Sequence, residues 1–526
     1  MDDQNKGNSQ QQCNISPRIL TACCSFRRSY EGRKRPSPDT AGDSRLQQVR
    51  HHRLVPDLRD HVSMSSSMSE HNNNQQRGLR EVIADNSFWT MPDREFLTLI
   101  KSEFPSELQR LHNATFVRDS KAPGPEGPSI SVILYGEDYA EVNRTLVGVL
   151  ALRWLWNNDY ETFVGRQSPA PVVLRRESFA WLREIYLKGL ANPEDIYTLI
   201  TSMVINDLGK DPNLAMDYAQ KEGLDISKVN HDMILYHAVK ARMVPALDRL
   251  TEENKACLLL GIKLGSDFNF GQLAQAENAP ASLAGLADMN GHDRAFEVRF
   301  MEQVLDLAGA SGHEDWTCAK KMIEPIFQSY RNVYDVAHAI ISGKTSLREG
   351  YDIILTRKLD LLHRAGYQRD FDIQNPSDRA LMRLFCLGNT SNAQNAEMYF
   401  TAFTERIPEA ARQSLVHGLN LDGTVEEPAV QTTYIPAMLT KAVGNTVSGQ
   451  DEEKLKAVAA VLRYLARCLV VERSRLERLP AGVTVIERDV KKIVPVLESE
   501  EFRNDPDVLD KEEIPEDQVA NMAPGY

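Results

Sequence analysis

The sequence predicts a mostly α-helical protein, with one large helical body between about Leu79 and Leu497. Through most of this span, apolar residues recur at the three- and four-residue spacing of amphipathic helices. The connections between these segments are short and often contain Gly, Asn or Pro, as in helical bundles. Only two short runs, Ile130–Tyr135 and Ala481–Ile486, have the composition of strands.

The two ends of the chain differ from this body in composition. Residues 1–78 are rich in Gln, Asn, Ser and Arg, which bury too little apolar surface to fold, so we expect a disordered tail there. Residues 498–526 contain 10 acidic and 2 basic residues and end in Pro and Gly. This composition predicts an acidic, mobile tail.

The net charge of −13 is unevenly spread along the 526 residues. Residues 1–80 carry 13 Lys and Arg against 8 Asp and Glu, a net +5, so the remaining chain carries −18. A strongly acidic body argues against a surface that follows a phosphate backbone, and nucleic acid is therefore not expected as a partner.

Cysteine usage and targeting signals indicate an intracellular protein. The seven cysteines are scattered without the paired spacing of zinc or redox motifs, which is typical of reduced thiols. The chain starts without the apolar region of a signal peptide, and its longest apolar run is too short to span a membrane. We expect a cytoplasmic or nuclear protein, in which the basic Arg33–Pro36 run either directs nuclear import or is simply solvated.

The most unusual stretch of the body is Asp195–Lys210. It is apolar on nearly all sides, which predicts a helix buried in a larger core. Asp207 continues the inward row of this helix, and a buried carboxylate is costly unless it is paired, hydrogen-bonded or bound to a metal. Gly209 is interpreted as the stop signal of the helix. Asp207 is therefore either a structural residue at a helix end or part of a metal or phosphate site.

The segment Asn206-Asp-Leu-Gly-Lys210 resembles the His-Asp-x-Gly-Lys motif of the HD-domain metal phosphohydrolases. The resemblance covers about residues 174–335 and implies an HD-like helical fold with a divalent metal held by Asp207. Asn206 stands where the family has a ligating His, and the upstream helix Glu177–Lys188 contains no His at all. Because two imidazole ligands are missing, the resemblance implies an altered metal site.

Further metal ligands are predicted from the same resemblance. His231 follows Asp207 by 24 residues, which fits the additional His of family members with two metals; alternatively it is a histidine at the start of a helix. The distant Asp of the family would be Asp306, on the polar face of a long helix. Asp335 is an equal candidate for that role.

Catalytic and ligand-binding roles follow from these assignments. Lys210 would contact phosphate, while the metal acidifies a bound water. In a helical enzyme unrelated to the HD family, His292 or His313 would instead serve as general base. Arginines on otherwise apolar helices predict either a small anionic ligand or internal ion pairs between helices; they are Arg357, Arg379 and Arg383.

Two classes of function remain open on the sequence alone. The first is an HD-like, metal-dependent phosphohydrolase with an altered metal site. The alternative is a non-catalytic helical module that binds a ligand or a protein, which the loss of both imidazoles favours. The sequence does not decide whether the protein is an enzyme, and it predicts no oligomeric state.

Overall fold

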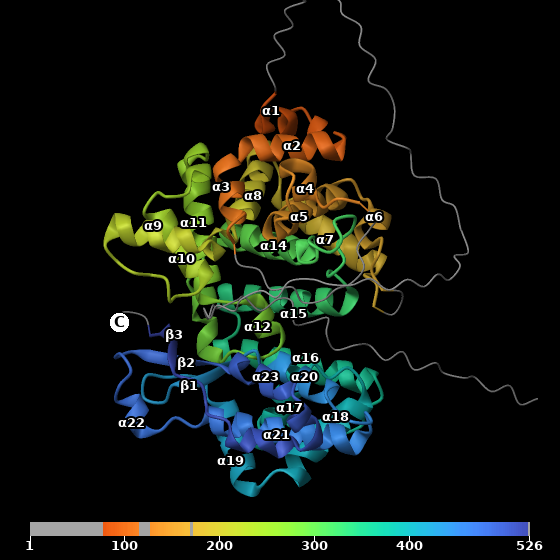
Figure 1. Ribbon diagram of the computed structural model, residues 1–526, viewed down its shortest axis with the longest axis vertical. Coiled ribbons are helices and arrows are strands. Elements are labelled where there is room, and N and C mark those ends of the chain that lie inside the picture. The colour runs from red at the N-terminus through yellow and green to blue at the C-terminus, as the bar shows by residue number, and fades with distance from the viewer. Residues whose placement is uncertain (1–76, 115–126, 169–171, 524–526) are drawn as a thin grey trace, which may run out of the picture.

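The computed structural model describes residues 77–114, 127–168 and 172–523, and it confirms that the chain is mostly helical (Figure 1). The strands of the described chain form one three-stranded sheet near the C-terminus. The predicted disordered tail over residues 1–78 falls, up to residue 76, outside the described residues.

The first part of the chain forms the upper half of the molecule in Figure 1. Its central helices are α5, α8, α10, α11 and α14, around which shorter helices pack. The helices of this part are α1 (Leu79–Ala84), η3 (Ser87–Trp89), α2 (Asp93–Glu103), α3 (Pro105–Leu111), α4 (Ile130–Tyr135), α5 (Ala140–Trp156), α6 (Tyr160–Val164), α7 (Arg176–Gly189), α8 (Pro193–Ile205), η4 (Leu208–Lys210), α9 (Pro212–Glu222), α10 (His231–Lys240), η5 (Pro245–Arg249), α11 (Glu252–Asp267), α12 (Phe270–Ala274), η6 (Pro280–Leu283), α13 (Ala284–Ala287), α14 (Asp293–Gly309) and α15 (Glu324–Ile341).

The second part, coloured teal to blue, forms the lower half and contains the sheet (Figure 1). It is organised around the long amphipathic helix α21. Its elements are α16 (Leu347–Arg364), α17 (Pro376–Leu387), α18 (Ala393–Thr401), η7 (Ala402–Arg406), α19 (Glu409–Asn420), β1 (Ala429–Thr433), α20 (Ile435–Gly444), α21 (Asp451–Leu469), α22 (Arg473–Leu476), β2 (Val483–Asp489), η8 (Val490–Ile493), α23 (Val494–Leu497), α24 (Glu500–Asn504), η9 (Pro506–Lys511) and β3 (Gln518–Met522).

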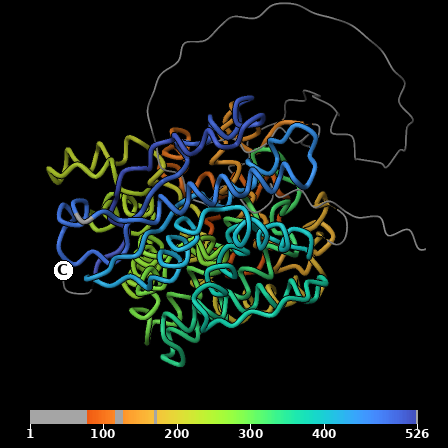
Figure 2. The backbone as a smooth tube through the Cα atoms, turned by 90° about the horizontal axis from the view of Figure 1, so that it is seen from below, coloured from red at the N-terminus to blue at the C-terminus, as the bar shows by residue number. Residues whose placement is uncertain are grey.

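Each part has its own hydrophobic core, and α17 belongs to both. Met382 and Cys386 of α17 pack in the first core, whereas Leu381 and Phe385 pack in the second. In the view from below, the teal and blue chain of the second part lies in front of the first (Figure 2). The two cores are therefore stacked along the long axis and share the helix between them.

The sheet has the order β1-β2-β3. β1 and β2 are parallel, with Ala429 opposite Val485, and the chain crosses between them through α20 and α21. β3 is antiparallel to β2. The Ala481–Ile486 run, expected to be β-like, lies at β2 as predicted. In contrast, β1 lies in a stretch whose composition is typical of a polar loop.

The prediction of a strand at Ile130–Tyr135 is wrong, since these residues form α4. The Ser129 side chain accepts a hydrogen bond from the Val132 backbone N–H at the start of this helix, and Gly136, with φ of 82°, ends it. A short apolar run fits a buried helix turn as well as a strand, and here the capping residues decide.

The C-terminal segment, expected to be a mobile acidic tail from residue 498, packs on the body as far as residue 522. The side chains of Phe502 and Leu509 are fully buried in the second core, and β3 completes the sheet. Some of the acidic side chains pair with a cation of the body: Arg463 on α21 contacts Asp507 and Asp510. The free energy gained by burying these two large apolar side chains holds the segment on the body, although its acidic composition predicts mobility.

In the described ranges, no helix is both long and apolar enough to cross a lipid bilayer.

Candidate functional site

Four segments of the first part carry charged side chains into its interior, where they form a charged cluster. The segments are α5, the end of α8 with η4, the start of α10, and α14, which are packed against one another. The members of the charged cluster are Glu141, Arg144, Asn206, Asp207, Lys210, His231, Asp232, Arg299, Glu302 and Asp306.

The end of α8 is shaped by close packing of the backbone. The helix ends at Ile205, a single 3-10 turn follows, and Asp211 then caps α9 through the backbone N–H of Asn213. A Cβ atom at Gly209 would collide with the backbone carbonyl of His231. Gly209 is therefore required by the close approach of η4 to α10, and not as the stop signal of α8 that the sequence suggests.

Lys210 lies between two carboxylates. Its Nζ is 2.8 Å from Asp207 Oδ2 and 3.2 Å from Glu141 Oε1. Glu141 Oε1 also accepts a hydrogen bond from Arg144 Nη1 at 3.1 Å. The Glu141 side chain is fully buried, so that a charge on it depends on these two cations.

Arg299 makes the second set of contacts in the charged cluster. Its Nη1 donates to Asn206 Oδ1 at 3.0 Å and to Glu302, and its Nη2 lies 3.3 Å from Asp232 Oδ1. The guanidinium lies against Gly265 of α11, where a Cβ atom would collide with it. Asn206, which the resemblance aligns with a ligating His, therefore serves as an acceptor for an arginine.

His231 lies between the two sets of contacts. Its Nε2 is 3.5 Å from Asp232 Oδ2 and 3.9 Å from Asp207 Oδ1. Its Nδ1 is buried and has no hydrogen-bond partner among the described residues. The ring is thus oriented by carboxylates on one side only.

The acids of the charged cluster differ in their affinity for protons. Burial raises the pKa of Glu141, against the opposing charge of Lys210, and raises the pKa of Glu302 to about 8. Burial and the neighbouring charge of Asp207 raise the pKa of Asp306. For Asp207 itself, burial acts in the same upward direction, but the cations led by Lys210 hold its pKa below the ordinary value. The cluster therefore holds an ionised Asp207 beside carboxyl groups that retain protons more strongly than usual.

The divalent metal that the resemblance implies does not fit these residues as they lie. One oxygen of each carboxylate, Asp207 Oδ2 and Glu141 Oε1, already contacts the ammonium of Lys210. No group of three or more His, Cys, Asp or Glu side chains in the described part of the chain is arranged to hold a metal ion. A metal at Asp207 would also lie beside two permanent positive charges, Lys210 and Arg144.

The structure brings together four of the six predicted site residues, namely Asp207, Lys210, His231 and Asp306. It places the other two elsewhere. His292 is exposed at the start of α14, and Asp335 is exposed on α15, where its Oδ2 lies 3.1 Å from Arg357 Nη1.

Sequence reasoning missed Glu141 and Arg144. Both lie in the first turns of α5, a helix whose other residues are almost all apolar and buried. Glu141 and Arg144, one turn apart at the start of a largely apolar helix, were the available signal, because charged groups are rarely buried without partners.

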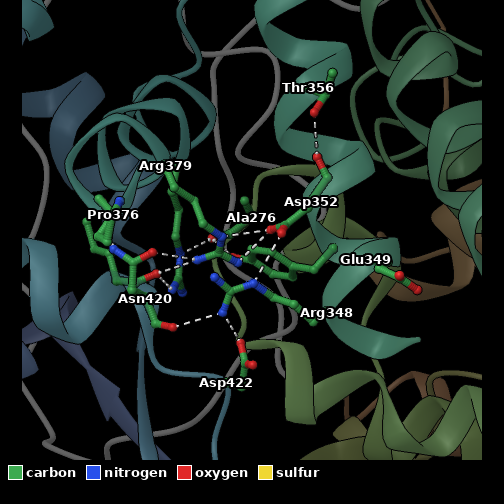
Figure 3. Close-up of polar contacts among 12 residues, drawn as sticks. Ala276, Arg348, Glu349, Asp352, Thr356, Pro376, Arg379, Asn420 and Asp422 are labelled. Carbon is green, nitrogen blue, oxygen red and sulfur yellow. Dashed lines mark hydrogen bonds and ion pairs between the residues drawn. The ribbon is translucent and has the colours of Figure 1, made fainter. Parts of the chain in front are cut away.

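A second buried polar network, the arginine network, lies where the two cores meet (Figure 3). Arg379 Nε donates to Asp352 Oδ1 at 2.8 Å, and Arg348 Nε donates to Asp352 Oδ2 at 3.1 Å. Arg348 also contacts Asp422, and Asn420 Oδ1 accepts from Arg379. Of the two interpretations that the sequence leaves open, internal ion pairs therefore account for Arg379, as they do for Arg357.

Arg383 is the exception within the arginine network. It is 2% exposed, and it donates hydrogen bonds to four backbone carbonyls. The acceptors are Ala276, Glu277 and Asn278 in the loop after α12, and Leu419 on α19. Ala276 has a left-handed backbone with φ of 51°, which is strained for Ala. Arg383 thus holds a strained loop of the first part to a helix of the second.

A groove of about 520 Å³ opens on the second part, between the start of α17 and α19. Its wall includes Asn420, which joins it to the arginine network. Its lining mixes both charges with apolar surface, and consists of Pro376, Ser377, Glu409, Arg412, Gln413, Val416, His417, Asn420, Leu421 and Glu427.

These features define a large helical protein of two stacked cores, with one buried charged cluster and one buried arginine network. The chain belongs to a family of unknown function, DUF6829, whose profile matches residues 97–509. The match spans both cores, so the charged cluster and the arginine network lie within one family unit.

No curated protein and no solved structure matches the chain. The resemblance to the HD-domain phosphohydrolases accordingly stays a prediction.

Proposed function

We propose that the chain is a non-catalytic helical protein that binds a ligand or a protein partner, and that its charged cluster serves the fold. The observation that carries this proposal is the position of the Lys210 ammonium between Asp207 and Glu141. A side-chain cation already compensates the carboxylates that a catalytic metal would need. The replacement of the motif His by Asn206, which binds Arg299, also supports a structural role for the charged cluster.

The groove beside Asn420 is the surface recess that we propose for the ligand. A small anionic ligand is the class we favour, because α17 begins at the groove and a helix N-terminus attracts anions. Arg412 and His417 line the same groove, together with the acids Glu409 and Glu427. We place the protein in the cytoplasm or the nucleus, since its four described cysteines are all buried free thiols.

Metal analysis of the full chain, purified without chelator and without a histidine tag, tests the proposal. We expect no bound metal, and we expect Asp207→Ala to lower the midpoint of thermal unfolding because it leaves Lys210 without its closest carboxylate. Asp207→Asn, which keeps the shape, separates the loss of charge from the loss of packing. Near one metal per chain in the native protein, absent from Asp207→Ala, would overturn the proposal.

A metal-dependent phosphohydrolase is the second candidate. It is favoured by the convergence of Asp207, Lys210, His231 and Asp306, which the order of the motif residues predicts. It is tested by turnover of phosphoesters and nucleotides with added Mn²⁺, Mg²⁺, Zn²⁺ or Fe²⁺. Turnover that disappears in Lys210→Met, while the variant stays folded, would establish this candidate in place of the first.

A further inference from the structure

The last strand, β3, leaves one edge of the sheet open. The sheet ends at β3, which pairs with β2 on one side only. On its other side, the backbone N–H and C=O groups of Gln518–Met522 make no hydrogen bond with any described residue. Unpaired backbone groups at a sheet edge form a template to which a further strand can add.

The opposite edge strand, β1, is covered by the molecule itself. All five residues of β1 are buried. Gln431, in its middle, accepts a hydrogen bond from Ser282 Oγ at 3.2 Å and donates one to Gln272 Oε1 at 3.1 Å. In contrast, Val519 and Met522 of β3 are 37% and 40% exposed. β3 also lacks the Pro and the charged side chains by which many proteins protect an exposed edge strand.

The two exposed apolar side chains of β3 lie on one face of the sheet. Val519 lies opposite Ile486 of β2, and Met522 lies opposite Val483. Directly opposite residues of an antiparallel pair point to the same side, and both β2 side chains are buried in the second core. Residues three apart point to opposite faces of a regular strand, but the irregularities in the β2–β3 register bring Val519 and Met522 to the same one. They therefore extend the apolar face of the second core to the open edge.

We propose that β3 pairs with β3 of a second copy of this chain, antiparallel and across a two-fold axis. An axis between Ala520 and Asn521 places Val519 opposite Met522 of the second copy, and Met522 opposite Val519 of that copy. Each exposed apolar side chain then covers another, as a self-complementary two-fold interface requires. The backbone groups of the open edge gain partners in the same step, and the two sheets become one continuous sheet.

The charges around β3 permit this pairing. β3 has no charged residue, and Asp517, directly before it, is paired with Arg488 at 2.6 Å. Like charges therefore do not face each other along the paired strands. The chains as a whole repel each other, because each carries a net charge of −13, and salt screens such repulsion. The dimer should accordingly tighten as the salt concentration rises.

Sedimentation of the full chain at rising concentration tests the proposal. Five residues per copy form an interface below the roughly 1,200 Å² of stable complexes, so we expect a dissociation constant on the order of 100 μM. At chain concentrations up to about 500 μM, the average mass should therefore rise toward that of a dimer, and further at high salt. A chain that stays monomeric throughout would overturn the proposal, including the case in which the edge binds a strand of a different protein.

Two matched variants locate the interface. Val519→Lys places a charge on the open edge, as natural edge strands do, and should raise the dissociation constant at least about tenfold. Val447→Lys makes the same change at a valine that is 63% exposed between α20 and α21, and should leave the constant unchanged. Both positions are exposed, so neither variant should lower the midpoint of thermal unfolding. Association of Val519→Lys as tight as that of the native chain would overturn the proposal.

Cysteine pairing tests the register. Chains with Val519→Cys and chains with Met522→Cys are mixed with glutathione disulfide, and the linked peptides are quantified by mass spectrometry. Directly opposite residues are close enough for a disulfide, so the link between these positions should form at least about fivefold more in the mixture than in either variant alone. Equal linking in the mixture and in the single variants would contradict the proposed pairing. None of these outcomes depends on the function proposed above.

Discussion

The charged cluster and Arg383 of the arginine network compensate buried charge in opposite ways. In the cluster, side chains compensate side chains: Lys210 contacts Asp207 and Glu141. In the arginine network, Arg383 donates hydrogen bonds to four backbone carbonyls. A carboxylate that loses its cation can bind a proton and become neutral, but a backbone carbonyl that loses its donor has no such response. The contacts of Arg383 should therefore tolerate substitution less well than those of the charged cluster.

The largest expected effect comes from Arg383→Met. The substitution leaves buried carbonyls of Ala276, Asn278 and Leu419 short of donors, which should cost about 4 kcal/mol of unfolding free energy. Urea denaturation measures the loss. Arg383→Lys should recover little, because an ammonium cannot reproduce the fork of the guanidinium. A loss no larger than that of the exposed-pair variant Arg357→Met would mean that Arg383 does not hold the two parts together.

The next largest effect is expected for Lys210→Met, which leaves Asp207 and Glu141 facing each other without a cation between them. We expect a loss of about 3 kcal/mol near pH 7. Adding Glu141→Gln in the same chain should restore part of it, since the second charge is then gone. A double-mutant cycle measures this coupling, and strictly additive losses would contradict it.

A pH-dependent effect, smaller per pH unit than the two losses above, is expected for Glu302→Gln. Burial raises the pKa of Glu302 to about 8 in the folded chain, so the folded state binds a proton that the unfolded state releases. This contribution to stability is complete below the unfolded pKa and is lost as the pH rises toward about 8. Glu302→Gln should therefore flatten the fall in stability above about pH 5, by up to about 1.4 kcal/mol per pH unit. Unchanged slopes in denaturation series at several pH values would refute this.

The smallest effect is expected for Asp335→Ala. Asp335 is exposed and pairs with the partly exposed Arg357, so its loss should change stability by less than about 0.5 kcal/mol. Asp306→Ala, in the buried cluster, should cost clearly more. Thermal unfolding of both variants compares the two aspartates that the sequence ranks equally, and a larger effect of Asp335→Ala would reverse their assignment.

The sequence predicted the helical fold because periodicity and capping are local properties. The buried helix expected within Asp195–Lys210 is found as α8. Local patterns could not tell a helical turn from a strand at Ile130–Tyr135. Nor could they predict that Phe502 is buried in a core to which residues far away in the chain contribute.

Part of the charged cluster was visible in the sequence because motif order places Asp207, Lys210 and His231. Glu141 and Arg144 precede that motif by more than 60 residues, and their contacts depend on how α5 packs against η4. The arginine network was less predictable still. The partners of Arg383 are backbone atoms of a loop, which no side-chain pattern records.

The two faces of α17 also have a consequence for how the protein can be divided. A helix that contributes Met382 to one core and Phe385 to the other cannot be assigned to either half without exposing apolar surface on it. A cut on either side of α17 therefore leaves one fragment with an uncovered core and the other with an uncovered helix. The chain should consequently melt in a single cooperative transition, and gene fragments that encode one core should yield aggregates instead of domains.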